Sequence, residues 1–111
     1  VLAIDDPILE AALSFIRKSY MNPIRVDDVT VAASVSRRVL ERHFHDKLRR
    51  TILEEIHQVR VDRAKSELVG TRDSMTAIAE RCGFRDGRHM SVLFRKYVNV
   101  TPSAYRLSFR P

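Results

Sequence analysis

The sequence is poor in residues that break a chain or cross-link it. Its 111 residues include one cysteine, three glycines, four prolines and no tryptophan. A single cysteine excludes an intrachain disulfide framework, which is typical of a reducing compartment. No apolar run approaches the roughly 20 residues that a bilayer-spanning helix needs, and no signal-peptide pattern opens the chain. We therefore expect a cytoplasmic, nucleoid-associated protein with no membrane partner. Because the first residue is valine and not methionine, we expect a fragment of a longer polypeptide, with a processed terminus as the alternative.

Constellations that support catalysis are also missing. We find no Ser-His-Asp arrangement, glycine-rich phosphate loop or paired acids, so the sequence predicts neither an enzyme nor a cofactor. His43 and His45 lie two residues apart, which places them on different sides of a helix, and no third metal ligand is evident. Cys82 falls on an apolar face and is predicted to be a small core residue.

Positive charge is abundant and clustered. Lysine and arginine number 20 against 14 acidic residues, a net charge of +6. The excess lies in residues 37–50 and 85–96, and each block coincides with a predicted helix that follows a turn. A surface that serves solubility alone tends to mix the two signs. Clustering therefore favours a polyanionic partner such as nucleic acid.

Apolar spacing indicates an all-helical domain of seven helices. Six of the predicted helices begin after a capping residue or a turn, at Asp5 or Asp6 before Pro7, Ser36, Thr51, Ser74, Gly83 and Thr101. The seventh is a short helix from about Asp27 to Ala33. Gly70 is expected to stop the long helix of residues 51–69. The predicted inward residues include Val39, Leu40, Phe44 and Leu48 in the third helix, Ile52, Ile56, Val59, Ala64 and Leu68 in the fourth, and Tyr105 and Leu107 in the last.

An internal repeat relates residues 26–44 to residues 75–94. Val29 falls on Ile78, Leu40 on Met90 and Phe44 on Phe94, and each copy is a short helix, a tight turn and a longer helix with a basic outer face. This arrangement is typical of the helix-turn-helix, whose second helix enters the major groove of DNA. Ordinary packing of helices is the alternative for either copy taken alone.

Three stretches carry a resemblance to a known family. They are RTILEEIHQVRVDRAKSEL, AIAERCGF and FRKYVNVTPSAYR, and they resemble the DNA-binding domain of the AraC/XylS family of bacterial transcription regulators over about residues 26–106. SRRVLERHF and the start of the long helix are similar to the xylose-operon regulators. The sequence departs from the family pattern at Arg49–Arg50, Glu67, Gly87–Arg88, His89–Met90 and Asn99.

The resemblance implies a homeodomain-like architecture with two helix-turn-helix subdomains. They would cover residues 5–50 and 70–111 and would be joined by a linker helix over residues 51–69. It also implies double-stranded DNA in adjacent major grooves as the partner, and RNA polymerase as a second partner. An absent N-terminal domain would bind a sugar-like effector, and the protein would activate a sugar-catabolism operon. A linker of 19 residues spans about 28 Å, close to the roughly 34 Å between grooves on one face of DNA.

The predicted contact residues follow from the outward faces of the two basic helices together with the family's positions. Base contacts are predicted for Arg38, Glu41, Arg42, Arg88, His89 and Val92. Phosphate contacts are predicted for Ser36, Arg37, Ser91, Arg95 and Lys96. Bracing an arginine is the alternative for Glu41, and a surface histidine without a DNA contact is the alternative for His89. Solvation alone is the alternative for Arg95 and Lys96, and general electrostatics is the interpretation for Arg49 and Arg50.

Two other functions remain open from the sequence. A basic helical module could bind nucleic acid by charge alone, in which case affinity would depend steeply on salt and hardly on base sequence. A helical protein-interaction domain would instead lose little affinity for its partner when Arg38, Arg42 and Arg88 are neutralised together.

Overall fold

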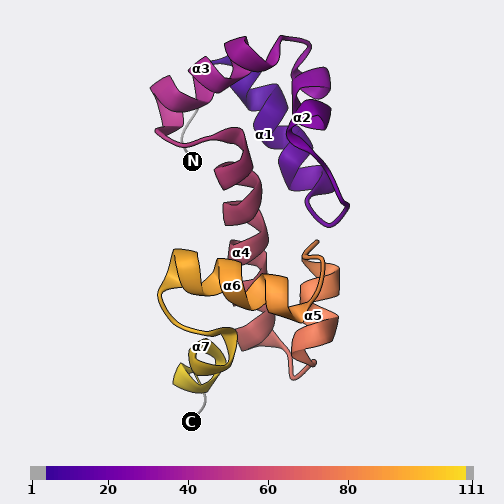
Figure 1. Cartoon of the computed structure of the whole chain (residues 1–111), viewed down its shortest axis with the longest axis vertical. Coiled ribbons are helices and arrows are strands. Elements are labelled where there is room, and N and C mark those ends of the chain that lie inside the picture. The colour runs from indigo at the N-terminus through magenta and orange to yellow at the C-terminus, as the bar shows by residue number, and fades with distance from the viewer. Residues whose placement is uncertain (1–4, 110–111) are drawn as a thin grey trace. The chain divides into compact units, whose positions relative to one another are not determined.

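A computed structural model describes residues 5–109, which form helices joined by short turns (Figure 1). The described residues contain seven helices: α1 (Pro7–Ser19), α2 (Val26–Ala33), α3 (Arg37–Leu48), α4 (Ile52–Gly70), α5 (Met75–Arg81), α6 (Gly87–Val98) and α7 (Pro102–Ser108). The prediction of an all-helical fold with seven helices is confirmed. None of the helices within residues 5–109 is long and apolar enough to cross a membrane.

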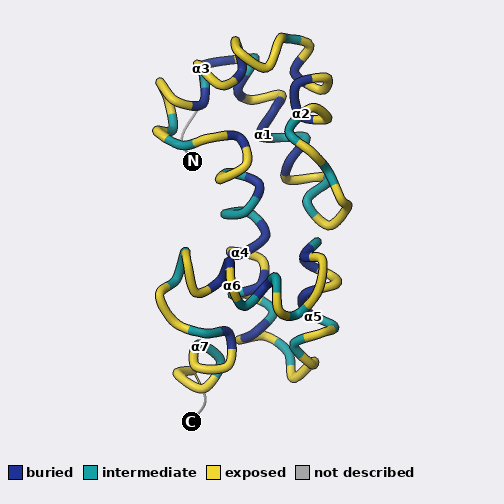
Figure 2. The backbone as a smooth tube through the Cα atoms, viewed as in Figure 1, coloured by how far each residue is buried: buried dark blue, intermediate teal, exposed yellow. Residues whose placement is uncertain are grey.

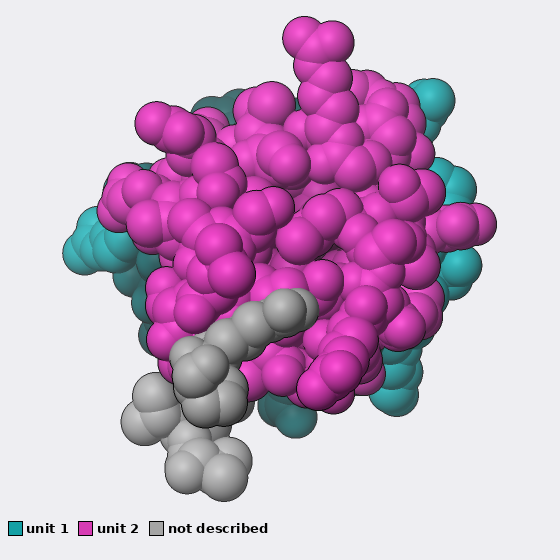
Figure 3. All heavy atoms as spheres, turned by 90° about the horizontal axis from the view of Figure 1, so that it is seen from below, with its two compact units in different colours: residues 1–56 teal, residues 57–111 magenta. Residues whose placement is uncertain are grey.

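The chain divides into two compact units, Val1–Ile56 and His57–Pro111, coloured separately in Figure 3. The boundary lies inside α4, so this helix contributes residues to both units. The narrower limits predicted for a separate linker, residues 51–69, remain a prediction.

Side-chain caps define where the helices begin. Ser36 Oγ accepts the Val39 N–H at 3.2 Å, and Thr51 Oγ1 accepts the Glu54 N–H at 3.0 Å while Glu54 accepts the Thr51 N–H at 2.8 Å. Such caps satisfy amide groups that have no partner within the helix. The caps predicted at the starts of α1, α3, α4, α5 and α7 are confirmed, with Asp6 rather than Asp5 at α1.

In the first unit, α1, α2 and α3 pack against one another around an apolar core (Figure 2). The fully buried side chains there include Leu9, Ile16, Val29, Leu40 and Phe44. The expectation for Val39 is wrong, because its side chain is 37% exposed. The buried face of α3 is centred on Leu40 and Phe44, which lie four residues apart, and Val39 is rotated away from it. Leu48 is half-buried.

The second unit has a core of its own, built from α4, α5, α6 and the turn between the last two. Its buried members are Val61, Ala64, Leu68, Ile78, Ala79, Cys82, Phe84, Met90, Leu93 and Phe94. The predicted core position of Cys82 is confirmed, and burial raises the pKa of its thiol to about 11. On α4 the sequence predicted that Val59 is buried and did not name Val61. Val59 is only half-buried, whereas Val61 is fully buried. Val61, Ala64 and Leu68 follow the three- and four-residue spacing of one helical face.

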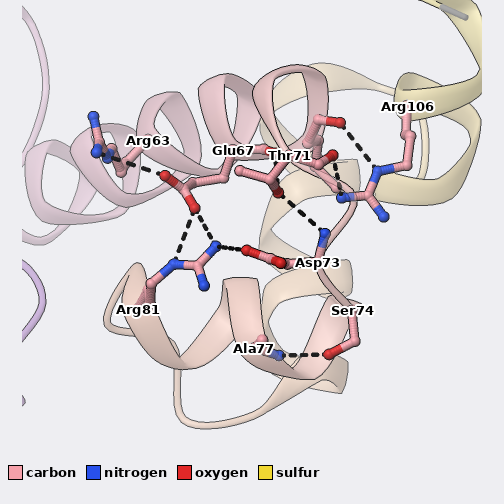
Figure 4. A network of polar contacts seen from close by, with 9 residues as sticks. Arg63, Glu67, Thr71, Asp73, Ser74, Ala77, Arg81 and Arg106 are labelled. Carbon is pink, nitrogen blue, oxygen red and sulfur yellow. Dashed lines mark hydrogen bonds and ion pairs between the residues drawn. The ribbon is translucent and has the colours of Figure 1, made fainter.

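The last helix, α7, contacts the C-terminal end of α4. The ring of Tyr105 packs edge-on against Phe94 with the ring centroids 5.3 Å apart. The guanidinium of Arg106 donates to the carbonyl oxygens of Leu68 at 3.0 Å and Thr71 at 3.3 Å (Figure 4). These bonds satisfy carbonyl groups at a helix end. The prediction that Leu107 is buried is wrong, because it is 66% exposed.

Gly70 is the last residue of α4, so the helix ends one residue later than predicted, and Gly70 does not adopt a left-handed conformation. Gly83 is the described glycine with a positive φ, at 88°. The chain leaves α4 through Thr71, whose Oγ1 donates to the Glu67 carbonyl at 2.8 Å and accepts the Asp73 N–H at 3.2 Å. The Glu67 carboxylate accepts hydrogen bonds from Arg81, which also donates to Asp73 at 2.7 Å (Figure 4). The charge of Glu67, a departure from the family pattern, is thereby matched by Arg81 on α5.

The internal repeat extends further than the predicted matches. Ser34 (φ 56°) and Gly83 (φ 88°) occupy the same place in the two turns. Two further left-handed residues, Arg49 (φ 56°) and Asn99 (φ 69°), follow the second helix of each copy. Two residues later, Thr51 and Thr101 cap the next helix. The two copies therefore share their turns and the exits of their second helices.

Candidate nucleic-acid interface

Helix α3 presents its basic face because its opposite face is anchored in the core. Leu40 and Phe44 have no exposed surface, and Ser36 fixes the first turn. The side chains of Arg38 and Arg42 are exposed, lie one turn apart, and make no hydrogen bond or ion pair with another described residue. Both guanidinium groups are therefore available to an external acceptor.

Arg37 and Glu41 are in a different situation. The Arg37 Nε donates to Glu41 Oε1 at 2.7 Å across one turn of α3, and both side chains are exposed. This pair neutralises one positive charge on the face that carries Arg38 and Arg42. Glu41 therefore holds Arg37 in place, and any contact of Glu41 with a base has to replace this bond.

Helix α6 starts at a cap that the sequence analysis missed. Asp86 Oδ1 accepts the His89 N–H at 2.7 Å, and Gly87 is the first helical residue. Met90, Leu93 and Phe94 are buried, which turns the other side of the helix outward. An aspartate directly before the first helical residue, Gly87, is the signal in the sequence that could have revealed this cap.

The outward face of α6 carries Arg88, Val92, Arg95 and Lys96. Arg88 and Arg95 are exposed and make no polar contact with the described residues, and Val92 is 61% exposed. The Lys96 ammonium lies 5.8 Å from the centroid of the Tyr97 ring. Ser91 was expected on this face but is half-buried, which leaves its hydroxyl less accessible than the arginines.

His89 is half-buried, and its ring is held in place. The rings of His89 and Phe84 form a T-shaped pair with centroids 5.9 Å apart, and His89 Nδ1 accepts the Arg85 N–H at 3.2 Å. Because Nδ1 is an acceptor, the neutral ring carries its proton on Nε2. Burial, together with the positive charges of Arg85 and Arg60, lowers the pKa of His89. The side chain therefore offers one N–H donor.

Gly87 has space around it. A Cβ added there would meet no heavy atom within 4 Å. The glycine at this position, a departure from the family pattern, is therefore not required by packing. Gly87 offers only backbone groups to a ligand.

The two histidines of α3 each lie next to an aspartate. His43 Nδ1 lies 2.7 Å from Oδ2 of the buried Asp6, which also accepts the Leu9 N–H at 3.1 Å. His45 Nδ1 lies 3.5 Å from Asp46 Oδ1. Within residues 5–109 no group of three or more His, Cys, Asp or Glu side chains is placed to hold a metal ion. The contact of Asp6 with His43 joins residues 37 positions apart, so no local pattern predicts it.

The chain was compared with known protein families and solved structures. The helix-turn-helix domain family matches residues 29–108. The crystal structure of an AraC-type DNA-binding-domain regulator from Chromobacterium violaceum is 33% identical, with a TM-score of 0.86 over 93% of this chain and 92% of that one. The chain belongs to the AraC-type helix-turn-helix family. It is a DNA-binding domain and not an enzyme, and the family prediction is confirmed.

Two other relatives bear on the function. The DNA-binding domain of AdpA, a global transcriptional factor solved with a target DNA, is 27% identical with a TM-score of 0.87 over 96% of this chain and 95% of that chain. The xylose operon regulatory protein of Escherichia coli K12 is 32% identical over 104 residues, which are 94% of this chain and 26% of that protein. The chain thus spans about a quarter of the curated regulator that it matches.

Proposed function

We propose that α3 and α6 are the two recognition helices of this AraC-type domain and that each enters a major groove of double-stranded DNA. The observation that supports this most is the pair Arg38 and Arg88. Both occupy the second position of their helix, both are exposed, and neither makes a polar contact with another described residue. A guanidinium left unpaired on a groove-sized helix is suited to the O6 and N7 acceptors of guanine.

We assign base contacts to the side chains that are free or can be freed. Arg38, Arg42 and Arg88 would bind guanine, and His89 would donate its Nε2–H to a single acceptor. The exposed isopropyl group of Val92 is suited to a thymine methyl group. Glu41 would accept from cytosine N4 when Arg37 turns to a phosphate.

We assign phosphate contacts to the ends of the two helices. Ser36 and Arg37 lie at the start of α3, where amide groups and the helix dipole favour an anion. Arg95 and Lys96 lie in the last turn of α6, with Ser91 one turn earlier. Contacts of this kind orient a protein on the duplex without selecting a sequence.

The α4 helix is proposed to set the spacing of the two contacts on DNA. Its 19 residues correspond to about 28 Å at 1.5 Å per residue. A single chain could then occupy two grooves on one face of the duplex, which dimers of single helix-turn-helix proteins achieve with two chains.

The regulator that contains this domain is proposed to act on a sugar operon. The support is the 32% identity to a xylose operon regulatory protein and the resemblance to the AraC/XylS family. In this proposal a region outside residues 1–111 binds a sugar-like effector, the protein resides in the cytoplasm, and activation involves RNA polymerase.

Selection of bound fragments from a random DNA pool tests the DNA-binding part of the proposal. We expect a motif with two half-sites about one helical turn apart. Enrichment of a single half-site would contradict the role of two recognition helices. No enrichment, combined with strongly salt-dependent affinity, would instead identify a module that binds by charge alone.

A further inference from the structure

Arg49 has a backbone conformation that suits glycine better than arginine. It follows α3 with φ 56° and ψ 36°, and its N–H donates to the His45 carbonyl at 3.1 Å. In this left-handed region the Cβ of an L-residue crowds the following carbonyl, whereas glycine and, to a lesser degree, asparagine avoid the conflict. At the matching place after α6 the chain uses Asn99. The strained position after α3 thus carries a long cation that the local backbone does not favour.

The side chain of Arg49 borders a hollow in the first unit. The hollow has a volume of about 520 Å³, and its lining includes Arg38, Arg42 and His45 from the outer face of α3. Arg49 is exposed and makes no side-chain hydrogen bond or ion pair with another described residue. The hollow therefore has several positive groups within a single depression.

The acidic groups of the same hollow already have partners. Glu41 is paired with Arg37 at 2.7 Å, and Glu54 accepts the Thr51 N–H at 2.8 Å. Arg50, next to Arg49, forms an ion pair with Glu55 at 2.9 Å, which partly neutralises its charge. Arg49 differs from Arg50 in having no anionic partner within the described part of the chain.

We propose that Arg49 contacts a DNA phosphate beside the base pairs bound by Arg38 and Arg42, an inference that rests on the proposed function of α3. A guanidinium binds phosphate oxygens through two parallel N–H donors. Arg49 lines the same depression as the two base-contacting arginines, so the backbone of the groove they occupy is its nearest anion. A strained backbone at a residue with no structural partner is typical of a functional position.

The test replaces Arg49 with glycine and measures stability and DNA binding together. Arg49→Gly should melt at a higher temperature than the wild type because the left-handed strain is removed. It should bind the selected DNA and random DNA about 3- to 10-fold more weakly, the range of one charge-assisted contact. The slope of log K against log salt concentration should become shallower by about 0.9.

Two matched variants control for backbone and charge. Asn99→Gly makes the same backbone change after α6 and should leave DNA affinity and salt slope unaltered. Arg49→Lys keeps the charge and the strain, so it should retain the wild-type salt slope with a smaller loss of affinity.

The outcomes separate this inference from the function it rests on. If Arg49→Gly binds with unchanged affinity and salt slope while the wild type still selects a motif, the phosphate contact is refuted and the proposed function stands. A changed base preference with an unaltered slope would also overturn it, because Arg49 would then contact a base. If the wild type selects no motif, the proposed function fails, and an unchanged slope in Arg49→Gly would refute the contact as well.

Discussion

At the level of single residues, the arginines of α3 differ in what their side chains already contact. Arg37 is paired with Glu41, whereas Arg38 and Arg42 make no polar contact with the described residues. A side chain that gives up no internal bond on binding keeps the full free energy of its contact with DNA. Clustered charge indicated a basic face, but it could not tell these arginines apart.

Arg42→Ala should weaken binding to the selected site by about 1–3 kcal/mol and relax the preference at one base pair. The physical reason is the loss of two donors to guanine. The measurement is titration against the selected DNA and its single-base variants. An equal loss on selected and random DNA would exclude a base contact.

Arg95→Ala provides the contrast from α6. Its side chain lies in the last turn, exposed and without a polar partner in the described region. We expect weaker binding to every sequence and a salt slope shallower by about 0.9. A new base preference in this variant would contradict the phosphate assignment.

Acid should destabilise the first unit through Asp6. Burial raises the pKa of Asp6. The hydrogen bonds from His43 and the Leu9 N–H, together with the charges of His43 and Lys47, outweigh this effect, so the pKa of Asp6 lies below its ordinary value of 3.8. The carboxylate therefore stabilises the fold above pH 3.8, and the contribution is lost as the pH falls through the lower folded-state pKa.

Melting of Asp6→Asn between pH 7 and pH 2 checks this expectation. The difference in melting temperature from the wild type should be large near neutrality and shrink below about pH 4. Asp5→Asn, at an exposed neighbour, should show a small difference at every pH. A pH-independent difference for Asp6→Asn would show that the carboxylate does not carry the effect.

At the level of helices, α4 stabilises the second unit through its buried face and through the hydrogen bonds at its C-terminal end. Ala64 has no exposed surface and belongs to the core of the second unit. Arg106, from α7, donates to the Leu68 carbonyl near the end of α4. The YR pair of the family resemblance is therefore explained by packing of Tyr105 and capping by Arg106.

Ala64→Asp should destabilise the second unit by more than about 3 kcal/mol, because it buries an unpaired carboxylate. Ser66→Asp, on the exposed side of the same helix, should change stability by no more than about 0.5 kcal/mol. Thermal unfolding followed by circular dichroism measures both. Similar melting of the two variants would mean that the predicted core face is not buried in solution.

Helix starts were predictable because their signals are local. A capping side chain accepts an amide three residues later, so the positions of Ser36, Thr51, Ser74 and Thr101 were visible in the sequence. The errors at Val39 and Val59 are of another kind. Apolar spacing defines a helical face only to within about one residue, and the neighbouring helices select which side chains it buries.

For the whole molecule, the proposed function places both recognition helices on one duplex. The selected site should then contain two half-sites about 10 base pairs apart. Inserting 5 base pairs between them rotates one half-site to the opposite face of the duplex. We expect binding to fall to the level of a single half-site, measured by titration with the spaced DNA. Unchanged affinity would mean that the units bind DNA independently of their spacing.

By itself, the sequence determined the all-helical class, the repeated helix-turn-helix and the buried stripes centred on Leu40, Phe44, Met90 and Phe94. Helix propensity, capping and apolar periodicity act within a few residues, so a linear pattern contains them. Only the tertiary structure decided which arginine side chains make no polar contact, which ring nitrogen of His89 carries the proton, and that the Asp6 carboxylate contacts His43. Those outcomes depend on the orientation of packed side chains or on partners far apart in the chain, and spacing along the sequence does not specify either.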